Sequence, residues 1–509
     1  MRTVALLTVL GLGVLGAGDW RTYSGDAQRT GWAKAEKTLS KQNVGNLKVE
    51  WTAQLDNEPI EMWNLTAPVV IPYNYTPQGV RDIAIVAGSS DTIYGVDIDN
   101  GKILWKKKFS HEGTPVNKGT GGWLCPNAIV ATPYIDAETK TVYVISSDGK
   151  LHSLAPTNGE DRVAPIQFVP PFSKNWSLNM VDGVLYTTVS QGCNGARNGV
   201  YAMDLKDAAH PVTSYRTYGG VWGRAGAAAG FDGRIYAEIG DGPFDPEAGK
   251  LSDAFIALEP KTLKLADWYA PKNQVFIDKK DLDMGNMTPV VFRFKGRELI
   301  AGSGKEGVFY LLDSKSLGGD DHRSPLYRSP GFTNEEANFQ ARGFWGALSV
   351  WEDGDGTTWL YGPAYGPQHP GAPAFPTAHG EAPDGSIMAF KVVDKNGKPE
   401  LSPAWRSVNM MAPDPAVIAN GVVYALATGD ATRQVASGGG ILSSKERLAE
   451  TKPAVLHAFD AQTGKELFSS GSTLKSFAHF SGLAVAEGRV FATTFDGKLH
   501  CFGLGDRGQ

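Results

Sequence analysis

The sequence predicts an all-β fold: an eight-bladed β-propeller of four-stranded antiparallel sheets, closed by pairing of the N- and C-terminal strands. One observation is a strand–turn–strand segment, clearest at residues 458–467, that recurs along the chain. A second is the composition: 61 Gly, 30 Pro and 10% aromatic residues in a chain of 509 suit short strands and turns. A third is that no long apolar stripe occurs at helical spacing.

The repeated segment joins a buried strand to a specific turn. In its best copy, Asp460 and Thr463 are placed to hydrogen-bond across the turn, and Gly464 to adopt a positive φ. Eight units occur at intervals of roughly 45 to 80 residues, at and above the spacing of propeller blades. The weaker copies lie at residues 95–105, 154–159, 202–205, 257–263, 311–315, 389–391 and 499–503. Because one four-stranded blade cannot bury both of its faces, the units are expected to pack in a ring.

The strand expected at residues 48–55 precedes the first complete unit. Pairing it with the last unit, around residues 490–502, closes the ring without leaving exposed strand edges. Five long connections are rich in Gly, Pro and polar residues, and such insertions gather on the ligand-binding face of a propeller. These connections are residues 110–127, 190–198, 241–252, 278–288 and 361–384.

The N-terminal 18 residues have the pattern of a secretory signal peptide. One Arg precedes an apolar core and then small residues, so cleavage is expected near Ala17 or Gly18. An uncleaved anchor is the alternative, although the stretch is short for a membrane span. Residues 19–509 are then a single propeller domain, and the protein is predicted to be periplasmic or secreted.

Export makes the three cysteines informative, because exported proteins meet an oxidising compartment. Three thiols allow one bridge and one remaining cysteine. Cys125 and Cys193 both lie in irregular connections, and they either pair with each other or remain thiols. Cys501 alternates with Leu499 on an expected strand and is predicted to be a buried, inert thiol.

The charge and the hydropathy exclude some functions. A net charge of −5 and a pI near 6.0 give no general basic field, so nucleic-acid binding is not expected. Beyond the first 20 residues, no apolar run is long enough to span a bilayer. The nine histidines show no zinc-like spacing, and no Cys-x-x-Cys-His motif for haem attachment is present.

The repeat Ala-x-Asp-x-x-Thr-Gly-x-x-x-Trp resembles the tryptophan-docking motif of the quinoprotein alcohol dehydrogenases. Those proteins are eight-bladed propellers that use pyrroloquinoline quinone (PQQ) and usually Ca²⁺. The opening segment, residues 20–51, is similar to theirs as well. The motif also occurs in non-catalytic relatives, including the outer-membrane assembly propeller, so the repeat leaves the choice between an enzyme and a scaffold open.

The resemblance extends to a cofactor site. Trp222, in a Gly-rich segment, matches the tryptophan that forms the floor under the quinone, and its alternative is a packed core aromatic. Asp241 stands where the family has a Ca²⁺-ligating Asn, and its carboxylate oxygen is an equally hard ligand. Lys305, between glycines, matches a cation at the quinone oxygens, and its alternative is a solvated turn lysine.

Other positions depart from the family pattern. Residues 190–198 contain no acid where the family has a Ca²⁺-ligating Glu. Many members also have a ring formed by two adjacent cysteines, and only Cys125 stands at that place here. The Asp-Asn pair expected for the catalytic base is missing. Asp253 is our candidate base, with Asp245 and Glu247 as nearby acids, although an Asp at a loop-to-strand junction is commonly a turn cap. Residues 281–286 either resemble the family segment that precedes the lysine matched by Lys305, or form a polar loop.

The resemblance implies an exported PQQ-dependent dehydrogenase-like protein that oxidises a small-molecule alcohol or sugar by hydride transfer to the bound quinone. Without a fused haem domain, the electrons have to leave to a separate acceptor. The alternative is a non-catalytic propeller, a scaffold or binding protein that has lost the cofactor. The missing acids favour this alternative, whereas Trp222 and Lys305 together favour the dehydrogenase.

Overall fold

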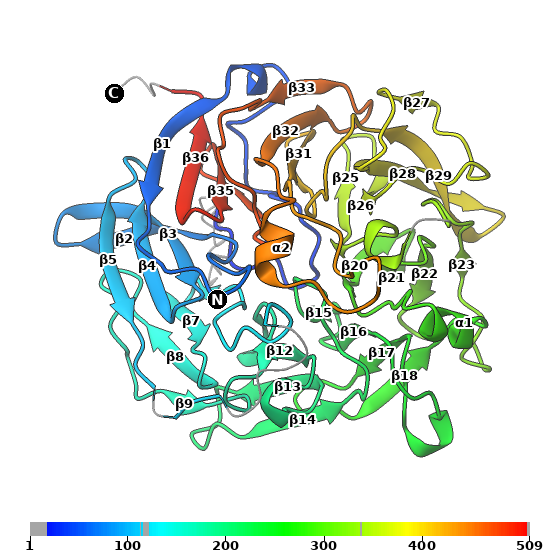
Figure 1. Cartoon of the computed structure of the whole chain (residues 1–509), viewed down its shortest axis with the longest axis horizontal. Coiled ribbons are helices and arrows are strands. Elements are labelled where there is room, and N and C mark those ends of the chain that lie inside the picture. Colours follow the sequence, from blue (N-terminus) through cyan, green and yellow to red (C-terminus); the bar gives the residue numbers. More distant parts are fainter. Residues whose placement is uncertain (1–17, 112, 116–121, 336–337, 506–509) are drawn as a thin grey trace, which may run out of the picture.

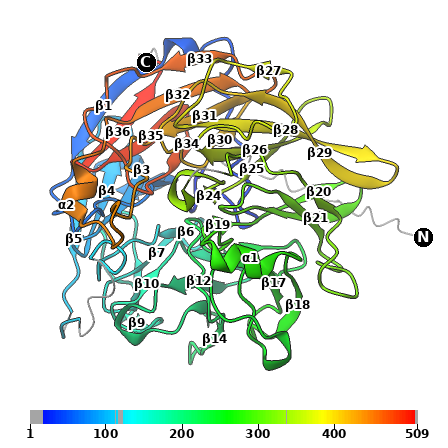
Figure 2. The ribbon, with the colours of Figure 1, turned by 45° about the vertical axis from the view of Figure 1, so that its right-hand side comes forward.

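A computed structural model of the chain describes residues 18–111, 113–115, 122–335 and 338–505. Within these ranges, eight β-sheets follow one another around a ring, and Figures 1 and 2 show this ring from two directions. The predicted eight-bladed all-β propeller is therefore confirmed. Except for Gly18, the predicted signal peptide of residues 1–18 lies outside the described residues.

We number the blades in chain order, with blade 8 combining the first strand and the last three strands. The strands of the first four blades are, in blade 1, β2 (Val69–Thr76), β3 (Gly79–Gly88), β4 (Thr92–Asp97) and β5 (Ile103–Lys108); in blade 2, β6 (Tyr134–Asp136), β7 (Thr141–Ile145), β8 (Lys150–Leu154) and β9 (Ile166–Gln167); in blade 3, β10 (Lys174–Asn175), β11 (Asn179–Val181), β12 (Val184–Ser190), β13 (Gly199–Asp204) and β14 (Val212–Arg216); and in blade 4, β15 (Ala228–Ala229), β16 (Ile235–Ile239), β17 (Ala254–Leu258) and β18 (Leu265–Tyr269).

The strands of the remaining blades are, in blade 5, β20 (Val290–Phe294), β21 (Arg297–Gly302), β22 (Tyr310–Asp313) and β23 (Tyr327–Arg328); in blade 6, β25 (Ser349–Glu352), β26 (Thr358–Tyr365), β27 (Thr377–Ala378), β28 (Gly385–Lys395) and β29 (Lys398–Arg406); in blade 7, β30 (Val417–Ala419), β31 (Val422–Ala427), β32 (Val455–Asp460) and β33 (Glu466–Ser469); and in blade 8, β34 (Leu483–Ala486), β35 (Arg489–Thr494), β36 (Lys498–Gly503) and β1 (Lys48–Gln54).

Two of the described blades exceed the predicted four strands. In blade 3, β11 adds to β12 beside β10, and in blade 6, β27 pairs in parallel with β29. A separate parallel pair joins β19 (Met287–Thr288) to β24 (Gly346–Ala347). The helical elements are short: α1 (Gln274–Lys279), α2 (Ser444–Leu448), η1 (Val44–Asn46), η2 (Cys193–Gly195), η3 (Pro246–Ala248) and η4 (Phe339–Ala341). No helix in the described part of the chain is both long and apolar enough to cross a membrane.

Blade 8 closes the ring as the sequence predicts. β1 runs antiparallel to β36, with Val49 opposite Phe502 and Ala53 opposite Leu499. Figure 1 shows these two strands side by side. The N-terminal strand thus pairs with the edge that the last hairpin would otherwise leave open.

Tryptophans dock neighbouring blades onto the repeated turn. Trp405 of blade 6 donates its indole N–H to Ala461 O in blade 7, and the ring lies against Gly464. A Cβ on Gly464 would lie 2.5 Å from the indole, and its φ is +71°, so both packing and backbone favour glycine. As predicted, Thr463 N donates to Asp460 Oδ1 across this turn, at 2.9 Å. The same arrangement places Trp51 on Gly101 and Trp105 on Gly159.

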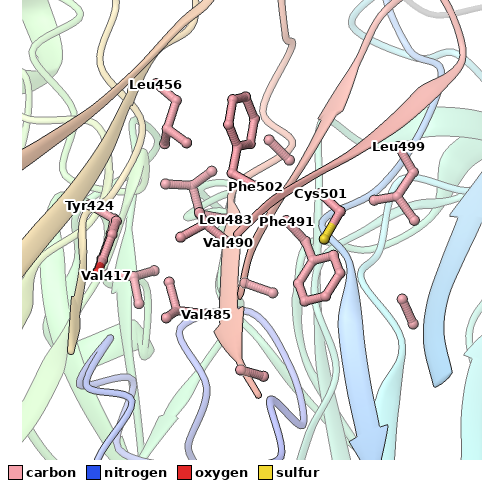
Figure 3. Packing of buried hydrophobic residues seen from close by; sticks show 14 of the residues in the cluster. Val417, Tyr424, Leu456, Leu483, Val485, Val490, Phe491, Leu499, Cys501 and Phe502 are labelled. Carbon is pink, nitrogen blue, oxygen red and sulfur yellow. The ribbon is translucent and has the colours of Figure 1, made fainter. Parts of the chain in front are cut away.

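The segment before β1 runs along the inner strands of the ring. Its backbone hydrogen bonds join Trp20 to Val70, Arg21 to Ile135, Ala27 to Ala229, Gln28 to Val291, Thr30 to Val350 and Gly31 to Ile418. The buried Arg29 guanidinium adds bonds to the carbonyls of Tyr23, Leu178 and Ala227. Apolar contacts between blades supply the rest of the core. Figure 3 shows the part where Val417 and Tyr424 of blade 7 face Leu483, Val490 and Phe502 of blade 8.

Candidate functional site

A cavity of about 460 Å³ is lined by loops from several blades. Four of the five long connections predicted to gather at a ligand-binding face contribute to it. Residues 110–127 supply Trp123, residues 190–198 supply Gln191, and residues 241–252 supply Asp241. Residues 278–288 supply Asp281 and Asp283, whereas none of the lining residues comes from 361–384.

Three loops interlock at one side of this cavity. Trp222 N donates to Gly285 O, and Gly240 N donates to Gly220 O, both at 2.8 Å. A Cβ on Gly285 would lie 2.4 Å from Gly240 N, so the backbones approach more closely than any larger residue allows. This close approach brings the side chains of Trp222, Asp241 and Asp283 to one place.

Lys305 joins them from the loop between β21 and β22. Its side chain is buried, and its ammonium lies 2.6 Å from Asp281 Oδ1 and 2.7 Å from Asp283 Oδ1. The same ammonium lies 5.2 Å from the centre of the Trp222 ring, and the Trp222 indole donates to Asp283 Oδ2 at 2.9 Å. Trp222 and Lys305, the two residues that the sequence assigns to the cofactor site, therefore both line this cavity.

Five carboxylates, two of them paired with this lysine, form two overlapping groups, which we call the acidic cluster. Asp241, Asp253 and Asp278 form one group, and Asp241, Asp281 and Asp283 the other. Within each group the oxygens lie within 4.8 Å of one another. Such spacing allows each group to share a single cation.

The charges of the acidic cluster are only partly balanced. Burial, followed by the nearby Asp283 carboxylate, raises the pKa of both Asp241 and Asp253. Burial alone would lower the pKa of Lys305, but Asp283 and Asp281 raise it above its usual range, so the lysine stays charged. Protonation of Asp241 and Asp253 therefore limits the repulsion within the cluster, and a bound cation would favour their ionised forms.

Within the acidic cluster, Asp253 is completely buried and does not line the cavity. Its backbone has a φ of +49°, and Gln274 donates to its Oδ2 at 3.4 Å. Of the other acids considered, Asp245 caps η3, and neither Asp245 nor Glu247 lines the cavity. Asp283, by contrast, lines the cavity itself. Asp281 and Asp283 lie two residues apart and shortly before Lys305, and this spacing is the sequence feature from which Asp283 could have been identified.

A second charged group in the cavity gave no sequence signal. Lys174 on β10 and Arg447 on α2 both line the cavity and are both buried, and we call them the cationic pair. In Figure 1, α2 lies near the centre of the ring. Because Lys174 and Arg447 come from blade 3 and from a loop of blade 7, no local pattern could connect them.

A disulfide joins Cys125 and Cys193, with their Cα atoms 5.6 Å apart. Each half lies beside cavity residues, Trp123 on one side and Gln191 on the other. The bridge spans 68 residues, for which loop-closure entropy gives about 4 kcal/mol of stabilisation. Cys501, on β36 of blade 8, is buried, as predicted.

Comparisons with known proteins agree with this architecture. Residues 24–210 match the PQQ_2 family, described as outer membrane protein assembly factor BamB. A search of the curated proteins found no match. The chain therefore carries PQQ-type repeats in this region.

Solved structures of similar fold include dehydrogenases. Quinohemoprotein alcohol dehydrogenase from Comamonas testosteroni is 15% identical with a TM-score of 0.62, covering 97% of this chain and 81% of that one. Quinohemoprotein alcohol dehydrogenase ADHIIG from Pseudomonas putida HK5 is 14% identical with a TM-score of 0.61 and the same coverage. A europium-containing methanol dehydrogenase is 12% identical with a TM-score of 0.60, covering 96% and 98%. These likenesses show the fold.

The residues present fit the groups that this fold implies. Asp241 Oδ1 and Asp253 Oδ1 are buried without a hydrogen-bond partner, and hard carboxylate oxygens suit Ca²⁺. Trp222 and Phe480 pack against a cluster that contains Trp63 and Trp176, and the rings of Trp63, Trp222 and Phe480 give the cavity aromatic surface for a planar ligand. The cavity volume is also within the range of about 300–1,000 Å³ typical of small-molecule sites.

Proposed function

We propose that the protein is an exported PQQ-dependent dehydrogenase that oxidises an alcohol or a sugar. The observation that supports this proposal is the convergence of Trp222, Lys305 and the acidic cluster on one cavity. PQQ, when bound, supplies the acceptor for the hydride of the alcohol carbon. The protein's part is to hold the reactants, balance their charge and take the proton.

Each group has a proposed role. Trp222 would lie against the planar quinone, and the Lys305 ammonium would stabilise negative charge that develops on its oxygens. Asp241, together with Asp281 and Asp283, would hold the cation. Ca²⁺ is the first candidate, and a trivalent ion is the second because one protein of the same fold contains europium.

A carboxylate of the acidic cluster would take the alcohol proton. Asp253 remains the residue predicted from the sequence, but it would have to act through Asp241, because it does not line the cavity. Asp283 lines the cavity directly and is the better placed alternative. Comparing kcat of Asp253→Asn and Asp283→Asn separates them when both variants are assayed with quinone bound and the cation saturating, because loss of the base lowers kcat under these conditions.

The surroundings of the site support the remaining parts of the proposal. The Cys125–Cys193 disulfide is consistent with an extracytoplasmic location, as the predicted signal peptide requires. No haem-attachment motif occurs in the sequence, so the electrons would pass to a separate acceptor.

The second candidate is a scaffold or binding propeller without a cofactor. It is favoured by the match of residues 24–210 to a family described as an assembly factor and by the lack of an acid in residues 190–198. Titration of the purified protein with PQQ, in the presence of Ca²⁺ or Eu³⁺, decides between the two. Uptake followed by dye-linked alcohol oxidation supports the dehydrogenase, and absence of uptake with either ion leaves the scaffold.

Variants test whether the proposed cavity is the binding site. Trp222→Ala and Lys305→Ala should each abolish tight quinone uptake. Trp268→Ala is the matched control, because this indole stacks on His322 outside the cavity. Tight uptake that survives both cavity substitutions would refute the site.

A further inference from the structure

Lys174 is a buried cation in the cavity wall. It is 5% exposed, and its ammonium lies 4.8 Å from the centre of the Trp63 ring and 5.2 Å from that of Trp176. Within the described residues, no hydrogen bond or ion pair reaches its Nζ. Lys305, buried in the same cavity, instead has two carboxylates within 2.7 Å.

Arg447 adds a second cation beside Lys174. It is 2% exposed, and its guanidinium lies 4.3 Å from the centre of the Trp123 ring. One of its nitrogens donates to Ala431 O at 2.7 Å, while Nε is buried without a hydrogen-bond partner. The nearest carboxylate, Asp430, is 3.7 Å away and is also bound to His479. Arg447 thus keeps donor capacity, and Asp430 does not compensate both cations.

The aromatic rings do not explain why a charged lysine lies here. Cation–π contacts with Trp63 and Trp176 are favourable, but they recover only part of the hydration that a buried ammonium loses. Burial, followed by the charge of Arg447, lowers the pKa of Lys174 to about 7, which expresses the same imbalance. An anion held between the two side chains would remove it.

We propose that Lys174 and Arg447 form a carboxylate-binding subsite in the cavity that also contains Trp222 and Lys305. This inference rests on the proposed function for the identity of the ligand beside Trp222 and Lys305. It adds that a ligand in the cavity carries a carboxylate. That carboxylate belongs either to the tricarboxylic quinone itself or to an acidic substrate such as a sugar acid. Lys174 and Arg447 would both donate charge-assisted hydrogen bonds to it.

The test compares charged and neutral forms of each ligand by isothermal titration of the whole protein. The probes are PQQ, PQQ trimethyl ester, gluconate and glucose, the sugars being added with and without quinone. Lys174→Met and Arg447→Met remove the charge and keep most of the apolar stem, and Lys174→Arg restores a charge. Lys391→Met is the control, because its ammonium also lies over an indole, Trp359, at 5.0 Å and outside the cavity.

If the quinone supplies the carboxylate, Lys174→Met should weaken PQQ binding by about 10- to 100-fold and leave the ester unchanged. If the substrate supplies it, the same loss should appear with gluconate and not with glucose. Lys174→Arg should recover much of the affinity, and Lys391→Met should change nothing.

The inference is overturned if Lys174→Met and Arg447→Met leave both PQQ and gluconate binding unchanged, or if the wild type binds neither. It can survive failure of the proposed function: a protein that takes up no quinone but binds gluconate through Lys174 has the subsite without the dehydrogenase site. Thermal unfolding of each variant verifies that it is folded. Because the methionine removes an uncompensated charge, loss of fold in Lys174→Met with retention in Lys174→Arg would assign the lysine a structural role and also overturn the inference.

Discussion

The acidic cluster and the cationic pair occupy one cavity and are built in opposite ways. The acidic cluster comes from neighbouring loops of blades 4 and 5, and Lys305 is paired inside it with Asp281 and Asp283. The cationic pair comes from blades 3 and 7, and Lys174 is paired with no described anion. One region is therefore assembled around an internal ion pair, whereas the other keeps a charge that a ligand can satisfy.

The largest effect on stability is expected when Asp283 is replaced. Asp283→Ala removes a carboxylate from the buried Lys305 ammonium and the acceptor of the Trp222 indole. We expect the free energy of unfolding to fall by about 3–5 kcal/mol, because a buried charge loses a partner. Chemical denaturation measures this change, and Eu³⁺ luminescence should show the loss of cation binding.

Asp320→Ala is the control for Asp283→Ala, because Asp320 is an exposed loop carboxylate. It should leave both measurements within error. An Asp283→Ala protein as stable as the wild type would show that the Lys305 pairs do not hold the loops together, and the distinction between the two regions would then fail.

The second largest effect on stability is expected from loss of the disulfide. Replacing both Cys125 and Cys193 with Ser removes a bridge between two loops that carry cavity residues. We expect a loss of about 2–4 kcal/mol in the free energy of unfolding. Cys501→Ser, within a blade-to-blade contact, provides a comparison in which no bridge is lost. If reduction of the wild type changes neither stability nor ligand binding, the bridge does not shape this wall.

Proton linkage should have opposite signs in the two regions. Asp241 and Asp253 have raised pKa values, so the fold holds protons that the unfolded chain releases above about pH 4. Their contribution to stability is therefore present at low pH and is lost as the pH rises toward the folded pKa values. Lys174 behaves in the opposite way, because burial lowers its pKa from 10.5 to about 7. Below pH 7 the buried charge lowers the free energy of unfolding by its full amount, and this loss is relieved as the pH rises from 7 to 10.5.

Ligand titrations make these signs measurable. Cation binding to the acidic cluster should release protons and strengthen as the pH rises from 6 to 9. Carboxylate binding at Lys174, which Arg447 faces, should take up a proton and weaken above pH 7, by at most about tenfold per pH unit. Calorimetry in buffers of different ionisation enthalpy counts the protons. Carboxylate affinity that rises between pH 7 and 9 would contradict the assignment of Lys174.

The ring of blades and about half of the cavity could be predicted from the sequence. In three copies of the turn, at Gly464, Gly101 and Gly159, a tryptophan of the neighbouring blade packs on the glycine, so there the local pattern reports a contact between blades. Trp222, Asp241 and Lys305 could be found because each lies in a short segment that resembles a known one. The Lys174–Arg447 pair could not, because only ring closure brings these residues together, and neither stands in a distinctive motif.

The smallest expected effect is also the one that separates the two regions most directly. Lys174→Met replaces a buried ammonium without an anionic partner by an apolar side chain of similar length. In the absence of ligand, we expect the free energy of unfolding at pH 7 to stay the same or rise by about 1 kcal/mol, since the lost cation–π contacts offset part of the relieved desolvation. Lys305→Met is the matched variant, and it should be destabilising because it leaves Asp281 and Asp283 facing each other without a cation. Equal losses in the two methionine variants, measured by urea denaturation, would mean that both lysines serve the fold alone. Opposite signs would show that Lys174 lowers stability to leave a charge exposed to the ligand.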